Sequence, residues 1–286
     1  MDEKEFPCYY IDSDNASKEA QSNYKRLIWL SLILMFLATL VESLAFAEPI
    51  KQYSAYAIFL SGFISVLLTL KKPERRWYKG RAIAESIKTL SWRYMMHVEP
   101  FDSDEEAENL RSFTERMDLI NKQANQEGFI AKPNKLHSDV ITVQMEQVRQ
   151  KNFLERKEFY KKQRIENQLE WYGKKSRQNR LLGSFCSWSI FVCQIVAGIY
   201  LLKYQSSSSE INLNAIMVFL ATSLIAIVEL NKFKDLHHAY GLTHQELNII
   251  RSRFGLIHDD LSFSQFVLEA EQAISREHTM WLARRA

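Results

Sequence analysis

The chain has 286 residues, of which 25% are charged, and its formal net charge is only +3. That charge is too small to indicate a nucleic-acid partner by itself. Three cysteines, Cys8, Cys186 and Cys193, provide neither a disulfide framework nor a paired metal motif. Eight glycines and five prolines favour long helices over turn-rich β-structure. We therefore expect a helical protein that binds no nucleic acid and needs no metal or other cofactor.

The first half contains two apolar runs, residues 27–47 and 53–70, joined by a short polar link. The first run carries one formal charge, Glu42, and the second carries none. A helix of about 20 apolar residues crosses the roughly 30 Å of bilayer hydrocarbon, and the backbone inside lipid must satisfy its own hydrogen bonds. These runs predict a membrane hairpin.

The chain ahead of the first run is expected to begin with an irregular tail over residues 1–13. Asp14 or Ser17 can then cap a helix that continues into the membrane. The acidic start lacks the basic region of a signal peptide, so we expect the first run to be retained.

A strongly basic stretch follows the second run. Six basic residues stand against one acidic residue in 71–81, and the same stretch carries Trp77. Short loops rich in Lys and Arg stay in the cytoplasm, which predicts that Leu70 is the inner end of its helix. The stretch is either a topology signal alone or, in addition, a site for anionic lipid headgroups. The residues concerned are Lys71, Lys72, Arg75, Arg76, Trp77, Lys79 and Arg81.

Two cytoplasmic helices are expected next. Residues 82–98 carry an amphipathic stripe with the spacing i, i+4, i+7, i+11, formed by Ile83, Ile87, Leu90 and Tyr94. A second helix is expected to begin with a capping box of Ser103 and Glu106 and to reach about Gln126. Gly128 is its expected stop, and residues 128–138 are expected to link the two halves.

From about Asp139 the sequence predicts helix without a clear break into a third apolar run, 181–202. A serine-rich link leads to a fourth run, 211–230. Basic residues flank the start of the third run (Lys174, Lys175, Arg177, Arg180) and the end of the fourth (Lys232, Lys234), so both flanks are expected in the cytoplasm.

The fold class that follows is an all-α membrane protein with four transmembrane helices as two hairpins and long amphipathic cytoplasmic helices. Both termini are expected in the cytoplasm. Four apolar helices buried inside a soluble protein are the alternative. Each half follows one plan, a lead-in helix, a hairpin and then polar helices, which predicts two modules, 1–130 and 131–286.

The lead-in of the second half, YKKQRIENQLEWYGKKSRQN at residues 160–179, resembles that of SLATT domains. These are two-transmembrane effector modules of bacterial conflict systems. The ending, with YGLTHQEL at 240–247, Phe266, Glu269 and EHTMW at 277–281, is also similar. The first half, with WYKGRAIAESIKTLSWRY at 77–94, resembles the partner type of SLATT module. The likeness covers nearly the whole chain.

The resemblance implies a bacterial inner-membrane effector. Such a protein is expected to form pores or disturb the bilayer, as in abortive infection, when a linked sensor or nucleotide-synthesising enzyme detects phage. The sequence shows no recognisable fused sensor domain, so the trigger is expected to act through the cytoplasmic helices or through a separate protein. A nucleotide second messenger or a separate sensor protein is the expected partner. A membrane-anchored scaffold or sensor without conductance remains the alternative.

No catalytic constellation is evident, so we expect no enzyme. His237, His238 and His244 lie near the fourth run but lack a familiar set of metal ligands. Glu42, beside Thr39 and Ser43, either lines or gates a pore or lies close enough to the outer headgroups to stay solvated.

Gln194 lies in the middle of the third run and needs a partner amide or carbonyl, and with Glu42 it is a candidate pore or packing position. Four spans rarely enclose water, so conduction predicts a homo-oligomer.

Overall fold

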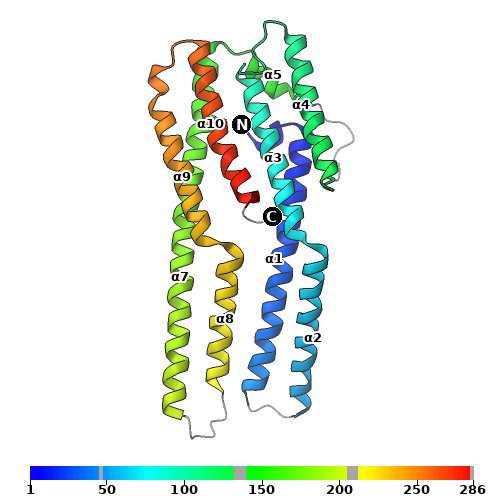
Figure 1. Cartoon of the computed structure of the whole chain (residues 1–286), viewed down its shortest axis with the longest axis vertical. Helices are drawn as coiled ribbons and strands as arrows, with labels where there is room; N and C mark the ends of the chain where they lie inside the picture. The colour runs from blue at the N-terminus through cyan, green and yellow to red at the C-terminus, as the bar shows by residue number, and fades with distance from the viewer. Residues whose placement is uncertain (45–47, 132–139, 205–211, 284–286) are drawn as a thin grey trace. The chain divides into compact units, whose positions relative to one another are not determined.

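The computed structural model describes residues 1–44, 48–131, 140–204 and 212–283. In these ranges the chain is helical and contains no strand, which confirms the all-α class. The helices are α1 (Cys8–Ser43), α2 (Glu48–Lys71), α3 (Pro73–Met95), α4 (Glu106–Gln126), α5 (Val143–Arg149), α6 (Phe153–Tyr160), α7 (Asn167–Tyr204), α8 (Leu213–Asn231), α9 (Phe233–Ser252) and α10 (Asp260–Ala283) (Figure 1). One π-helical turn, Lys161–Glu166, joins α6 to α7.

The chain forms two compact units. One, which we call the polar unit, comprises residues 1–21, 74–175 and 239–286. The other, the membrane unit, comprises residues 22–73 and 176–238 and contains all four apolar runs. The described ranges contain four helices that are long and apolar enough to cross a membrane. The apolar segments lie in α1, α2, α7 and α8. The prediction of two membrane hairpins is thereby confirmed.

The helix order of the first half repeats in the second. Each hairpin ends at a lysine with a positive φ, Lys72 (42°) after α2 and Lys232 (52°) after α8. At each lysine the chain leaves the span and starts a polar helix, α3 or α9. The predicted boundary between modules at residues 130 and 131 stays a prediction.

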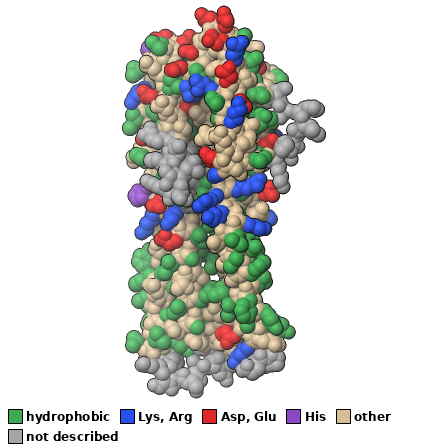
Figure 2. Space-filling view, turned by 45° about the vertical axis from the view of Figure 1, so that its right-hand side comes forward, with side chains coloured by type: hydrophobic (Ala, Val, Ile, Leu, Met, Phe, Trp, Pro, Cys, Tyr) green, Lys and Arg blue, Asp and Glu red, His purple; other side chains and the backbone are tan. Residues whose placement is uncertain are grey.

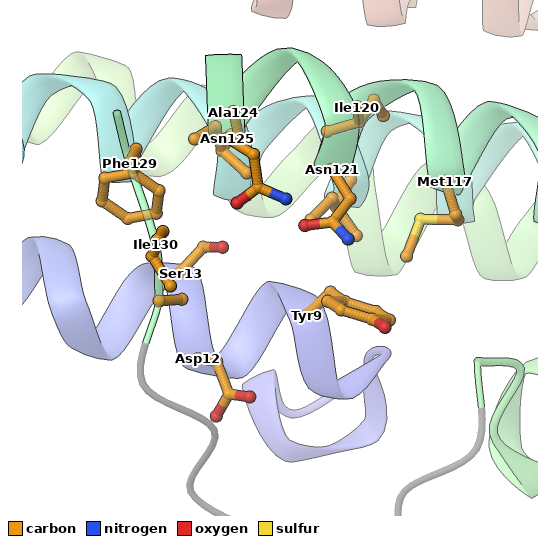
Figure 3. Close-up of a pocket in the computed structure, with 13 residues that line it drawn as sticks. Tyr9, Asp12, Ser13, Met117, Ile120, Asn121, Ala124, Asn125, Phe129 and Ile130 are labelled. Carbon is orange, nitrogen blue, oxygen red and sulfur yellow. The ribbon is translucent and has the colours of Figure 1, made fainter. Parts of the chain in front are cut away.

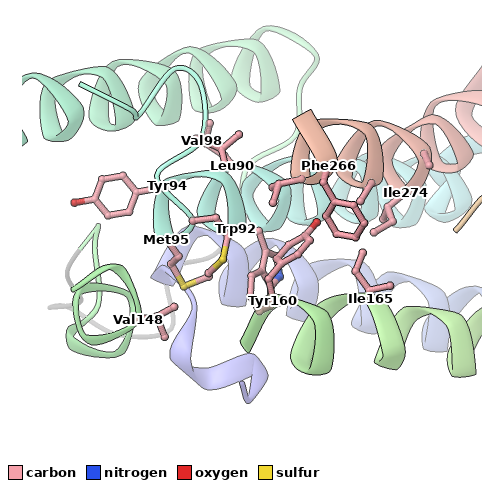
Figure 4. Close-up of a cluster of buried hydrophobic side chains, with 14 of the residues drawn as sticks. Leu90, Trp92, Tyr94, Met95, Val98, Val148, Tyr160, Ile165, Phe266 and Ile274 are labelled. Carbon is pink, nitrogen blue, oxygen red and sulfur yellow. The ribbon is translucent and has the colours of Figure 1, made fainter. Parts of the chain in front are cut away.

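Aromatic residues hold the polar unit together. Its core draws on α1, α3, α4, α7 and α10, and Trp92 lies at its centre beside Tyr160 and Phe6, with ring centroids 5.6 and 6.1 Å away (Figure 4). The expected stripe of α3 is confirmed: Ile87, Leu90 and Tyr94 are buried, and Ile83 packs against them half-buried.

The expected irregular tail is wrong, because α1 begins at Cys8 rather than near Asp14. Phe6 and Tyr10 are buried against the core, so the first residues are fixed by packing. Asp14 is itself buried and pairs with Lys18 at 2.6 Å instead of capping a helix.

The expected capping box of α4 is also wrong. The Ser103 hydroxyl accepts from the Glu105 amide and donates to Glu108, while the Glu106 carboxylate pairs with Arg149. The end of α4 is as predicted, since Gly128 has a φ of +73°. Most of the expected linker, residues 132–138, lies outside the described ranges.

The expected unbroken helix from Asp139 is interrupted. The α5 helix ends at Arg149, and Asn152 starts α6 by accepting a hydrogen bond from the Glu155 amide at 3.0 Å. The amides in the first turn of a helix have no carbonyl partner within the helix, and an Asn just before that turn accepts a hydrogen bond from one of them.

Candidate functional site

The surface of the membrane unit is mostly hydrophobic (Figure 2). Few side chains of the spans are buried, and nearly all of those are small: Ala38, Ser43, Ser54, Ser61, Ile64, Cys186, Ala197 and Ala221. An apolar surface of this extent is unsuited to water. Small residues at helix contacts let backbones approach closely in lipid, where hydrophobic association is absent.

Serines join the helices of the first hairpin. The hydroxyls of Ser31 on α1 and Ser61 on α2 are 2.8 Å apart, and Ser61 also approaches the Ser31 carbonyl at 3.3 Å. The first hairpin meets the second where Phe36 and Phe219 pack with centroids 5.9 Å apart. The membrane unit is thus a bundle in which both hairpins contribute to one interior.

Glu42 lies at the linker end of the membrane unit, where α1 stops and α2 starts. It is the second-last residue of α1, it is exposed, and its carboxylate accepts a hydrogen bond from Ser54. Ser43 is buried, and its carbonyl accepts from the Asn212 amide at 2.8 Å. Thr39 donates to the Met35 carbonyl of its own helix. These residues gather near one end of the bundle, which brings a carboxylate and hydroxyls together there.

The opposite, basic end of the membrane unit carries a pair of cations on every span. The pairs are Lys25 and Arg26, Lys71 and Lys72, Arg177 and Arg180, and Lys232 and Lys234. Because the spans of each hairpin run antiparallel, the residues just ahead of the apolar runs within α1 and α7 share this end with the residues at and after the ends of α2 and α8 (Figure 1).

The predicted basic residues divide into two groups. Arg76 donates to the Ile130 carbonyl, Lys79 donates to the Glu127 carbonyl, and Arg81 pairs with Glu85 at 2.8 Å, all inside the polar unit. Trp77 and Lys175 belong to the same group: the Trp77 ring packs on Tyr78, and Lys175 is not without a partner. The others are exposed and make no side-chain hydrogen bond or ion pair to any described residue: Lys71, Lys72, Arg75, Lys174, Arg177 and Arg180.

Gln194 is exposed on the surface of the membrane unit, which sequence analysis did not anticipate. No side-chain hydrogen bond joins it to the residues that the structure describes. The expected partner is therefore not in the described part of this chain.

The polar unit contains a fully buried ion pair that sequence analysis missed. Arg164 and Glu271 are each 1% exposed, and two parallel bonds of 2.8 and 2.7 Å join them. Tyr160 and Thr89 also donate to the Glu271 carboxylate, both at 2.9 Å. One signal in the sequence was the placement of Glu271 beside Ala270, Ala273 and Ile274, on the apolar face of an amphipathic helix.

The pKa values of Arg164 and Tyr160 keep the guanidinium charged and the phenol neutral. Burial opposes the charge of Arg164, but its attraction to Glu271 and the hydrogen bonds that it donates to that carboxylate hold its pKa above the ordinary value. Burial and then the Glu271 charge raise the pKa of Tyr160 well above its ordinary value, so its hydroxyl stays a donor. Arg164 lies in the π-helical turn, a feature often found at functional positions.

The polar unit also contains a cavity of about 260 Å³ between α1, α3 and α4. In Figure 3, Asn121 and Asn125 extend from α4 toward α1, with Tyr9 and Phe129 on either side. Asp12 supplies one carboxylate, and none of the described residues in the lining is Lys or Arg. The cavity therefore suits a flat, uncharged group better than a phosphate.

Two of the three histidines near the fourth span have ordinary polar partners, and the ring of the third, His238, packs on His237 with centroids 5.3 Å apart. His237 contacts Ser176 through Nδ1 at 2.8 Å, and His244 contacts the Leu169 carbonyl and Asn248. Within the described ranges, no three His, Cys, Asp or Glu side chains gather as metal ligands would.

His97 provides a test of electrostatics in the polar unit. Its Nε2 lies 3.0 Å from the Arg149 carbonyl, and burial, followed by the charges of Arg149 and Arg156, lowers its pKa below 6.5. The unfolded chain then binds more protons than the folded one between the two pKa values, so stability falls as pH drops through this window. We expect the melting temperature in detergent to decrease from pH 7.5 to 5.5. A His97→Asn variant, which tolerates the positive φ of 54°, should reduce this dependence; an unchanged slope would contradict the assignment.

The architecture defines an all-α membrane protein built from two tandem hairpins. Residues 7–157 match the family model of the SMODS and SLOG-associating 2TM effector domain 3, and residues 160–281 match that of domain 1. The chain therefore belongs to the SLATT family and carries two of its domains. The same comparisons find no match among curated proteins or solved structures.

The two matched segments share one core in the polar unit. Thr89 and Trp92 come from the first segment, and Tyr160, Arg164 and Glu271 come from the second. The tandem domains are thus joined by a buried polar network as well as by apolar packing.

Proposed function

We propose that this chain is an oligomeric effector of the bacterial inner membrane that forms a pore or disrupts the bilayer during anti-phage defence. The observation that carries the proposal is the pair of effector-domain matches on a chain with four apolar spans. Glu42, Thr39 and Ser43 are the candidates to contact permeating ions at the linker end. The proposal assigns no enzymatic activity.

The proposed orientation places both termini and the polar unit in the cytoplasm. All four spans carry their basic pairs at the same end, opposite the linker end. Positive flanks stay in the cytoplasm, and the six exposed cations without a side-chain partner are also suited to anionic headgroups.

The trigger is proposed to act through the polar unit, either as a nucleotide second messenger or as a separate sensor protein. The cavity beside Asn121 and Asn125 could receive a nucleotide base through amide hydrogen bonds and the Tyr9 and Phe129 rings. The phosphates would need cations outside the lining.

Membrane potential during infection tests the effector function. The chain is expressed with its genomic neighbours, and a potential-sensitive dye is followed after phage addition. Depolarisation that precedes lysis and requires this chain is expected, because a pore dissipates ion gradients. Protection with unchanged polarisation would overturn the proposal.

A membrane-anchored scaffold is the second candidate. It is favoured by large apolar side chains on the polar unit that are about 70% exposed, namely Leu154, Leu256 and Leu261. Recordings from the purified protein in planar bilayers separate the two candidates. An effector pore should conduct with its trigger, and a Glu42→Gln variant should alter its cation preference, whereas a scaffold conducts under no condition.

A further inference from the structure

The exposed surface of α7 in the membrane unit consists of two different stripes. One, which we call the amide stripe, has heptad spacing and combines the small or polar residues Ser184, Ser187, Gln194 and Gly198 with two large apolar ones, Phe191 and Leu201. The neighbouring stripe contains only large apolar side chains: Leu181, Phe185, Trp188, Val192, Ile195, Ile199 and Leu202. Every residue of both stripes is exposed.

Lipid solvates the apolar stripe well, but it solvates the Gln194 amide of the other stripe poorly. Burying an amide in hydrocarbon without a hydrogen-bond partner costs several kcal/mol by transfer measurements. Ser187 satisfies its hydroxyl by donating to the Gly183 carbonyl of its own helix. Gln194 has no such bond to any residue that the structure describes.

Gln194 lies too deep in the bilayer for its side chain to be hydrated at the headgroups. With a rise of 1.5 Å per residue, it lies roughly 21 Å along the helix from Arg180 and about 14 Å from Lys203. Both distances exceed the reach of a glutamine side chain to the headgroups. A partner amide from another molecule inside the bilayer would satisfy both the donor and the acceptor of this carboxamide.

Gly198, one turn beyond Gln194, leaves room for that molecule. A Cβ at Gly198 would meet no atom within 4 Å, so nothing in the described chain fills this place. Heptad spacing with small residues is the pattern of closely packed membrane helices that cross at a small angle.

We propose that a second copy of this chain packs along the amide stripe, with the two Gln194 carboxamides hydrogen-bonded to each other. A carboxamide has both a donor and an acceptor, so it complements itself across a two-fold axis. Parallel copies present the same stripe at the same depth, and the axis then runs along the membrane normal. The proposal rests on the oligomeric effector proposed above and supplies its interface.

Disulfide cross-linking of the full chain in liposomes tests the position of the interface. Cysteine is introduced at Gly198 or, as the matched control, at Val192, in a background where Cys8, Cys186 and Cys193 are alanine. Val192 is exposed at similar depth, about 160° around the helix from Gln194. Oxidation should give a covalent dimer for Gly198→Cys and much less for Val192→Cys. Equal yields, or none at Gly198, would overturn the proposed contact.

Substitution of the amide tests its contribution. Gln194→Leu should weaken dimerisation roughly three- to tenfold, the usual effect of an interhelical hydrogen bond in membranes. Val192→Leu should leave it unchanged. Dimer fraction is counted by single-molecule photobleaching at low protein density, and circular dichroism confirms that each variant is folded. Unaltered association of Gln194→Leu would overturn the role of the amide.

The same samples separate this inference from the proposed function. A cross-linked dimer that never permeabilises liposomes supports the interface and counts against the pore. Permeabilisation with Gly198→Cys remaining monomeric overturns the interface alone. A Gly198→Cys cross-link in cells to a protein of different mass, without dimer, would identify a different partner and also overturn the proposal.

Discussion

Glu271→Leu is expected to lower the free energy of unfolding by about 3–5 kcal/mol, the usual cost of leaving one member of a buried ion pair without its partner. The variant leaves the guanidinium of Arg164 in an interior where it is 1% exposed. Tyr160 and Thr89 lose their acceptor in the same step. Thermal unfolding in detergent, followed by circular dichroism, measures the loss.

A double variant shows that the uncompensated charge causes this loss. Arg164→Met with Glu271→Gln removes both charges and keeps an oxygen that can accept from Tyr160. Replacing both members of a buried pair is often neutral or stabilising, so this variant should recover most of the stability. If it is as unstable as Glu271→Leu, the role assigned to the charge is wrong.

The position of the pair gives the experiment a second readout. Hydrogen exchange should accelerate in both matched segments, in α3 near Thr89 and in α10 near Glu271, because the network joins them. Acceleration confined to α10 would show that the segments open separately.

Arg149→Ala is expected to cost about 2–4 kcal/mol, because it removes the partners of buried carbonyls. Arg149 donates to the carbonyls of Tyr94 and Phe101, and its guanidinium lies 4.4 Å from the centre of the Tyr94 ring. Each buried carbonyl left without a partner costs on the order of 1–3 kcal/mol. Thermal unfolding measures this effect as well.

Glu106→Gln is the matched control for Arg149. The Glu106 side chain is 61% exposed, so its ion pair with Arg149 is screened by solvent and contributes less than about 1 kcal/mol. A cost for Glu106→Gln as large as that for Arg149→Ala would show that the ion pair, and not the carbonyl contacts, holds this part of the polar unit.

Two buried arginines, Arg149 and Arg164, connect helices of the polar unit and so join parts of the two SLATT domains. Arg149 fixes the connection between α3, α4 and α5 inside the first matched segment. Arg164 and Glu271 fasten the second segment to α3. A change in either matched segment of the polar unit therefore reaches a core that both segments share.

The sequence by itself determined the features that depend on local composition. Each of the four apolar runs is long enough for a helix to cross the hydrocarbon core of a bilayer. They can therefore be recognised as spans without knowing how the helices pack. Gly128 ends α4 because only a residue without Cβ adopts its φ easily. The family likeness of residues 160–179 was likewise readable before the fold.

Only the tertiary structure decided the features that join distant parts of the chain. The start of α1 at Cys8 depends on Trp92, which buries Phe6, and Glu271 finds its partner 107 residues away. The exposure of Gln194 depends on which face of α7 the other spans leave uncovered. Hydropathy and helix propensity are properties of neighbouring residues, whereas these pairings follow from how separate helices pack, which no local pattern records.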